Sequence, residues 1–184
     1  MSDRLKPMIH FVVQHARPDL LGATKLNKVL WFADVMHYRQ HGRTISWRTH
    51  YTKNTFGPVP PGSLAALAEL KRESQIVERS VATPAGPRRE FVWLHPADLS
   101  VFAQTEIEVL HEVIAWASTI TAKEISDLTY DALWEETEMG RPMSVAAASV
   151  TPCEPDEEDI AWAEAVFGGE GSPAGPDDAL RQAS

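Results

Sequence analysis

The segment from Lys25 to Pro60 constrains the fold of this chain more than any other part of the sequence. Over Lys25–Gln40, apolar residues recur at steps of three and four, which is the pattern of an amphipathic helix. Further apolar side chains widen the stripe beyond its usual arc: Trp31, Phe32, Val35 and Tyr38. We therefore expect a central helix that neighbours contact on several sides, with Thr24 as its N-cap and Gly42 as its C-cap.

The rest of the pattern predicts shorter helices and strands around this helix. Helices are expected over Leu5–His15, Leu64–Leu70, Phe102–Trp116, Thr121–Leu128 with a Thr121–Glu124 capping box, and from about Asp131 to Glu136. Strands are expected over residues 49–53, 75–81 and 89–95, and a turn at 82–87 makes the last two a hairpin. The fold class that follows is mainly α (α+β): a compact helical domain with a small β-hairpin or sheet.

Two further segments are interpreted as irregular. FGPVPPGS, residues 56–63, is a turn in which each proline holds its predecessor extended and Ser63 caps the next helix. GRPMSVAAA, residues 140–148, is interpreted as a loop or a last strand.

Size and composition favour one domain with a tail. The chain has 184 residues, of which 43% are hydrophobic and 23% charged, as in ordinary globular proteins. No apolar run is long enough to cross a bilayer, and the N-terminus lacks the apolar core of a secretory signal. Cys153 is the only cysteine, which excludes an intrachain disulfide and a cysteine-based zinc cage. We expect a cytoplasmic protein.

Charge is distributed unevenly along the chain. Residues 1–100 hold 14 Lys and Arg against 8 Asp and Glu, whereas residues 101–184 hold 3 against 18. We predict a domain over residues 1–150 and an acidic, Pro- and Gly-rich tail over 151–184, with a short amphipathic helix at 156–167. The tail either covers a basic face, serves a separate partner or keeps the protein soluble.

The sequence gives little support to an enzyme. Asp34, His37 and His41 would share one helical face and could ligate zinc, but no Glu follows the first histidine as a metalloprotease motif requires. His41 also suits a helix end, where it interacts with the last carbonyls. No Gly-x-Ser-x-Gly elbow occurs, and Cys153 lies in an acidic segment that would raise its pKa. We predict no catalytic residue, no metal and no cofactor.

A nucleic-acid alternative rests on the order of elements after Leu64. A helix followed by a hairpin is the order of a winged helix-turn-helix, and Arg88 and Arg89 would lie on the wing. Two observations argue against DNA binding. The helix offers only Lys71 and Arg72, near its end, for contacts with DNA, and the chain is acidic overall. Nucleic-acid binding therefore stays the second hypothesis.

Aromatic and basic residues alternate after the central helix. This combination dominates the energetically important positions of protein interfaces, so we predict a partner-binding surface there. Its expected members are Arg43, Trp47, Arg48, Tyr51, Lys53 and Phe56.

Two linked motifs carry a resemblance to a known family. The first is KLNKVLWFADVMHYRQHGRTI followed by FGPVP, and the second is EISDLTYDALWEETEMGRPMS. Together they resemble the signature of the Panacea domain, the SocA-like antitoxin family, over about residues 5–150. The chain departs from it at Tyr130, where the family often has His, and in the ending RPMSV.

This resemblance implies an antitoxin that binds a cognate protein toxin, and some members of the family are adaptors that deliver the toxin to a cytoplasmic AAA+ protease. It implies no substrate. We expect no association with a membrane, and nucleic acid is not the first expected partner. The motif residues are expected to fix the fold: Lys25, Asn27, Lys28, Trp31, Asp34, Gly57, Pro58, Pro60, Ser126 and Trp134.

Overall fold

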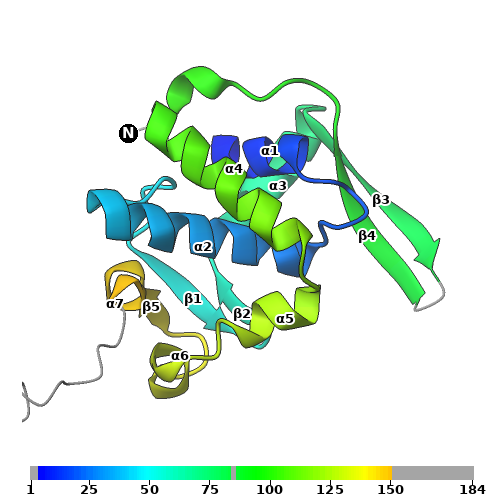
Figure 1. Ribbon diagram of the computed structural model, residues 1–184. Helices are drawn as coiled ribbons and strands as arrows, with labels where there is room; N and C mark the ends of the chain where they lie inside the picture. The colour runs from blue at the N-terminus through cyan, green and yellow to red at the C-terminus, as the bar shows by residue number, and fades with distance from the viewer. Residues whose placement is uncertain (1–3, 84–85, 151–184) are drawn as a thin grey trace, which may run out of the picture. The chain divides into compact units, whose positions relative to one another are not determined.

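The computed structural model describes residues 4–83 and 86–150 (Figure 1). Its α-helices are α1 Leu5–His15, α2 Ala23–His41, α3 Ser63–Arg72, α4 Gln104–Ser118, α5 Ala122–Asp127, α6 Ala132–Glu136 and α7 Val145–Ser149. Its strands are β1 His50–Asn54, β2 Gly57–Val59, β3 Ile76–Thr83, β4 Gly86–Trp93 and β5 Pro142–Ser144, and a 3-10 turn covers Leu99–Val101. The predicted α+β class is confirmed. The helix predicted at residues 156–167 lies outside the described residues.

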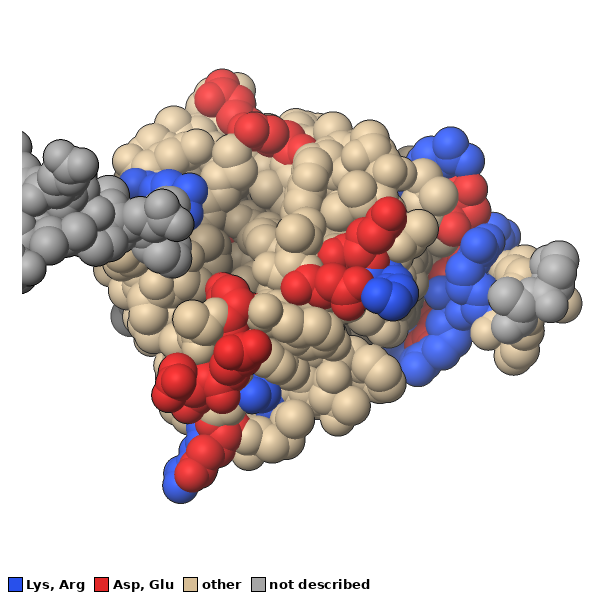
Figure 2. Space-filling model, turned by 60° about the horizontal axis from the view of Figure 1, so that its bottom comes forward, with Lys and Arg blue, Asp and Glu red and all other residues tan. Residues whose placement is uncertain are grey.

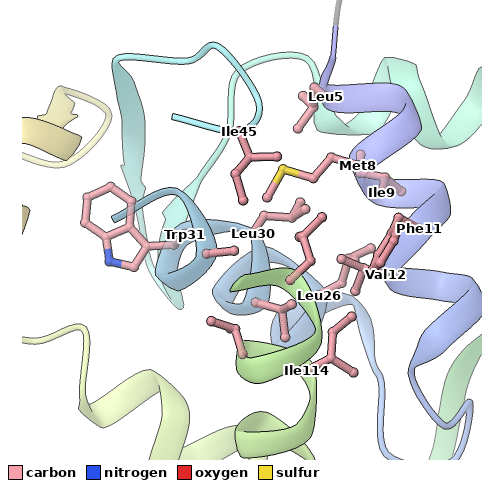
Figure 3. Close-up of a cluster of buried hydrophobic side chains, with 14 of the residues drawn as sticks. Leu5, Met8, Ile9, Phe11, Val12, Leu26, Leu30, Trp31, Ile45 and Ile114 are labelled. Carbon is pink, nitrogen blue, oxygen red and sulfur yellow. The ribbon is translucent and has the colours of Figure 1, made fainter. Parts of the chain in front are cut away.

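Helix α2 is the centre of the domain, as its wide apolar stripe predicted. It contacts α1, α4, α5, α7 and β2. Figure 3 shows Leu26 and Leu30 of α2 meeting the apolar side of α1 and Ile114 of α4. Leu26 and Leu30 are at most 1% exposed. Removing such side chains from water supplies most of the stabilisation of a domain of this size.

A three-stranded antiparallel sheet of order β2-β1-β5 lies beside α2 (Figure 1). Lys53 pairs with Pro58 and Tyr51 pairs with Met143. The sequence indicated a turn where β2 forms, and that interpretation was wrong for Gly57–Val59. Proline lacks an N–H, but it is tolerated in an edge strand, where no further strand needs that donor.

The second sheet is the predicted hairpin, β3–β4, which is confirmed with pairing from Ile76↔Trp93 to Thr83↔Gly86. Ile76 and Phe91 are buried at its base. The hairpin extends from the helices with α3 and α1 beside its base (Figure 1).

Two of the predicted helix caps were wrong. Helix α2 begins at Ala23 after an extended Gly22, so that Thr24 lies inside the helix, and α3 begins after Gly62 in the left-handed conformation (φ 89°). Glycine suits the N-cap position of α3 because it adopts the left-handed conformation freely. The Gly42 C-cap and the Thr121–Glu124 capping box are confirmed.

Candidate protein-binding site

A buried carboxylate fixes the loop that follows α2. Asp34 is fully buried, and its Oδ1 accepts hydrogen bonds from the N–H groups of Ile45 (2.8 Å) and Ser46 (2.9 Å). Its Oδ2 accepts from the Tyr51 hydroxyl (2.7 Å) and from the Ser46 hydroxyl. Burial raises the pKa of Asp34 to about 6, and these donors hold the pKa from rising further. The carboxyl is therefore ionised at pH 7 and ties the loop to the helix.

A buried lysine lies where the two motif segments meet, close to Gly57 and Thr129. Lys28 on α2 is 1% exposed, and burial lowers its pKa to about 8. No hydrogen bond or ion pair joins its ammonium to any residue that the structure describes. A Cβ added to Gly57, at φ 104°, would lie 1.8 Å from the Lys28 Nζ and 2.8 Å from Thr129 Oγ1. Only glycine allows the strand to approach the lysine this closely.

The other motif residues hold neighbouring turns. Lys25 Nζ donates to the Ile120 carbonyl (2.5 Å), which ties α2 to the start of α5. Ser126 Oγ donates to the Ala122 carbonyl (2.8 Å) within α5. Asn27 is half-buried, and its side chain makes no hydrogen bond with another described residue. Trp31 is 3% exposed, and Pro58 and Pro60 are buried.

Lys53 holds α6 against the sheet. Its Nζ donates to the carbonyls of Trp134 (2.5 Å) and Thr137 (2.8 Å) and lies 4.4 Å from the centre of the Trp134 ring. Lys53 is half-buried in this position. Trp134, a predicted fold-fixing residue, therefore receives the side chain of a predicted partner-binding residue.

Trp47 is the most unusual of the predicted surface residues. Its backbone is left-handed (φ 61°), and 47% of the residue is exposed. The Arg4 guanidinium lies 5.0 Å from the centre of the Trp47 ring and 5.1 Å from that of Phe102. Nη1 and Nη2 of Arg4 donate to the Glu106 carboxylate, at 2.8 and 2.6 Å. The indole is thus fixed from behind by a buried ion pair and presented to solvent.

The basic residues near Trp47 have different environments. Arg43 is exposed, and its carbonyl accepts a hydrogen bond from Nδ1 of His37 (2.7 Å). Arg48 is half-buried, and its backbone N–H donates to the Ser46 hydroxyl (3.1 Å). A Cβ added to Gly62 would lie 3.6 Å from Nη2 of Arg48, so this side chain crosses the loop before α3.

The structure corrects one predicted surface residue and separates the others. Tyr51 is fully buried because its hydroxyl is bonded to the inward-facing Asp34 carboxylate, so it belongs to the core. Phe56 is 67% exposed at the β1–β2 turn. Trp47 and Phe56 lie beyond opposite ends of the five-residue β1, which is about 17 Å long at 3.3 Å per residue. They are therefore separated by at least the length of this strand.

The geometry does not support a zinc site at Asp34, His37 and His41. The Asp34 oxygens are occupied by four donors, and the rings of His37 and His41 lie 4.5 Å apart. Burial lowers the pKa of His37, and its Nδ1–H donates to the Arg43 carbonyl of the loop. Within residues 4–83 and 86–150, no group of three or more His, Cys, Asp or Glu side chains could hold a metal ion.

A groove that the sequence did not reveal lies between α2 and α4. It has a volume of about 460 Å³, and its main apolar members are Phe32, Met36, Trp116 and Leu128. The Phe32 and Trp116 rings meet edge to face with centres 5.0 Å apart. The excess width of the α2 stripe was the signal for this groove, because helix residues beyond the core-facing arc must meet another surface.

The arginines of the predicted wing are engaged in ion pairs. Arg89 bonds Glu78, and Arg79 and Arg88 bond Glu90 at 2.9 and 2.6 Å. These pairs lower the pKa of Glu78, to about 2, and that of Glu90, so both carboxylates stay charged beside the arginines. Phosphates would have to compete with carboxylates already in place.

Comparison with known proteins identifies the domain. The model of the family described as "Antitoxin SocA-like, Panacea domain" matches residues 26–135, which contain all of α3–α5 and most of α2 and α6. Comparisons with curated proteins and with solved structures found no match. In the described part of the chain, no helix is both long and apolar enough to span a membrane. The matched region is more than half of the chain and includes Lys28, Asp34 and Gly57, so the chain belongs to the SocA-like antitoxin family of Panacea domains.

Proposed function

We propose that this protein is the antitoxin of a toxin–antitoxin pair and neutralises a protein toxin by binding it directly. Membership of the antitoxin family supports the role. The observation that carries direct binding is Trp47: a large aromatic side chain, 47% exposed, on a left-handed backbone. Such backbone strain persists where the surroundings impose it, and it is concentrated at functional sites.

The energetics support this use of Trp47. A non-glycine residue in the left-handed region costs roughly 1–2 kcal/mol. The Arg4 guanidinium against the ring offsets part of this cost, since a cation over an indole contributes about 0.5–2 kcal/mol. The result is a rigid indole in the loop that also carries Arg43 and Arg48, and tryptophan and arginine are among the residues most enriched at interface hot spots.

The roles of the other predicted surface residues follow from their positions. Arg43 and Arg48 would contact the toxin together with Trp47, because all three belong to the loop between α2 and β1. Phe56, beyond the other end of β1, would contact a different part of the toxin or a second partner. Lys53 contributes indirectly by holding α6 in place.

Further parts of the proposal concern the location of the protein, the fate of the toxin and the extent of the folded domain. We propose that the protein works in the cytoplasm as a non-enzymatic binder and hands the toxin to an AAA+ protease. The lone cysteine, which fits a reducing compartment, supports the location. We also propose that residues 1–150 form the folding unit, since every described core side chain lies between Leu5 and Val145.

Co-expression with the product of the adjacent reading frame tests the proposal. The neighbour should arrest growth alone, be rescued by this protein and co-purify with it. Trp47→Ala should abolish rescue and capture while leaving the fold intact. Leu64→Ala, at a residue that is 81% exposed on α3, is the matched control and should change neither. A harmless neighbour that does not bind would refute the pairing.

The same strains test the hypothesis of delivery to a protease and that of DNA binding separately. Toxin that disappears only when both this protein and a cytoplasmic AAA+ protease are present supports delivery, whereas stable, bound toxin supports simple neutralisation. DNA binding is not favoured by the paired arginines of β3–β4. Salt-sensitive retention on promoter DNA would revive it.

A further inference from the structure

We propose that the groove between α2 and α4 receives an amphipathic α-helix of the toxin whose apolar face is flanked by lysine and arginine. This inference rests on the proposed function and names the chemistry of the partner. It concerns a surface separate from the loop that carries Trp47. The argument depends on the shape of the groove, the side chains that line it and the charge of its walls.

The floor of the groove is apolar and is not covered by any described residue. Phe32 and Met36 from α2 and Trp116 from α4 are half-buried, so each keeps part of its apolar surface in contact with water. Leu128, which follows α5, is 57% exposed at the edge of the same groove. Apolar surface concentrated in one concave site marks a place where another molecule binds.

The spacing of the lining residues fits a helical partner. Residues 32, 35, 36 and 39 of α2 line one wall, which is an i, i+3, i+4, i+7 series. At 1.5 Å per residue this wall extends for about 10 Å, or two helical turns. A helix laid against such a wall inserts its own apolar residues at the same spacing, as in other helix-in-groove complexes. The half-buried Trp116 of α4 packs against Phe32 in the same groove, where it would serve as an anchor.

The charge of the walls selects a basic partner. Over residues 104–141, which form α4, α5 and α6, eight carboxylates are exposed against two basic side chains. Those two, Lys123 and Arg141, already pair with Asp127 (2.5 Å) and Glu138 (3.4 Å). Figure 2, which brings this side of the molecule forward, shows acidic side chains in groups around uncharged surface.

The carboxylates closest to the groove are Glu112 on α4 and Asp131 before α6, both of which line it. The basic residue in the lining, Arg39, donates from its Nε to the Ser149 carbonyl (3.0 Å). Lysine or arginine on the flanks of a docked helix would face these carboxylates. An acidic helix would be repelled by the same rim, which gives specificity by charge.

The test uses the full chain and the toxin identified by co-expression. Trp116→Ala removes the anchor, and Trp93→Ala, at a 44% exposed residue on β4, is its matched control. Glu112→Lys reverses one rim charge, and Glu108→Lys makes the same change one turn earlier on α4, outside the groove lining. We expect Trp116→Ala and Glu112→Lys each to weaken toxin binding at least tenfold, and the two controls to change it less than threefold.

Each outcome has one meaning. If the wild-type protein binds no toxin, the proposed function fails and the inference falls with it. If it binds toxin and the two groove variants behave like their controls, the inference is overturned and the proposed function stands. Glu112→Lys decides the question if Trp116→Ala does not fold, because Glu112 is exposed and its replacement leaves the core intact.

Hydrogen exchange on the bound toxin tests the chemistry of the partner directly. The toxin segment protected by the wild-type protein and released by Glu112→Lys should be helical and rich in lysine or arginine. A protected segment that is acidic or extended would overturn the assignment.

Discussion

Replacing Lys28 by methionine should stabilise the domain. Lys28 is 1% exposed, and its ammonium has no hydrogen bond or ion pair with any described residue. Its pKa falls from 10.5 to about 8 on folding, which corresponds to about 3 kcal/mol at 1.36 kcal/mol per pKa unit. Methionine keeps the length of the side chain and its helix propensity but carries no charge. We therefore expect Lys28→Met to raise the free energy of unfolding by about 2–3 kcal/mol at pH 7.

The pH dependence provides a second signature. Because the pKa of Lys28 is lower in the folded state, the unfolded state holds the extra proton between pH 8 and pH 10.5. The stability of the wild-type protein therefore rises with pH over that window, and the penalty is complete below it. Between pH 7 and pH 9.5 the advantage of Lys28→Met over wild type should shrink by about 2 kcal/mol.

Urea unfolding of the wild-type and Lys28→Met proteins at the two pH values, monitored by tryptophan fluorescence, measures this difference. The contributions of other titrating groups are the same in both proteins and cancel. Lys25→Met is the matched control on the same helix. Lys25 donates to the Ile120 carbonyl, so its removal leaves that acceptor unpaired and should cost about 1–2 kcal/mol. If Lys28→Met destabilised the domain as Lys25→Met does, the buried ammonium would have a partner and the reasoning would be refuted.

Three further changes test the core and the domain boundary. Tyr51→Phe removes one donor from the buried Asp34 carboxylate and should cost about 1.5–3 kcal/mol in urea unfolding. Gly57→Ala places a Cβ 1.8 Å from the Lys28 ammonium on a backbone at φ 104°, and should lower the free energy of unfolding by at least about 2 kcal/mol. Removal of residues 151–184 should change the melting temperature of the domain by less than about 3 °C, the equivalent of roughly 1 kcal/mol.

Each of these expectations has an outcome that contradicts it. Gly42→Ala is the control for position 57, because Gly42 also has a positive φ (68°) but would meet nothing within 4 Å. If Gly42→Ala and Gly57→Ala lowered the free energy of unfolding equally, backbone strain and not the nearby lysine would be the reason for glycine at position 57. A Tyr51→Phe protein as stable as wild type would show that the Asp34 carboxylate is satisfied without the phenol. A large loss of melting temperature on truncation would place the domain boundary beyond residue 150.

Local sequence signals were sufficient for most elements of the fold. The bounds of α1 were predicted as observed, and the β3–β4 hairpin follows from two short apolar segments around a turn. The Thr121–Glu124 capping box also formed as predicted. These features depend on residues within one or two turns of each other, so a short stretch of sequence is enough to predict each of them.

The predictions that failed depend on distant residues. Thr24 and Ser63 have the chemistry of N-caps, but both helices start earlier, after Gly22 and Gly62. The prolines around β2 predict a turn, whereas Gly57–Val59 forms a strand because it pairs with β1.

The sequence by itself determined that this chain has a central helix with an unusually wide apolar stripe, two linked family motifs and an acidic second half. Tertiary structure decided which side chains remain available to a partner. Tyr51 and Trp47 look alike in the sequence, yet the Asp34 carboxylate draws the Tyr51 hydroxyl into the core, while a left-handed backbone holds Trp47 at the surface. The groove between α2 and α4 likewise exists only once the helices pack. Whether a side chain is buried depends on which helices and strands pack against it, so it cannot be predicted from one segment of the sequence.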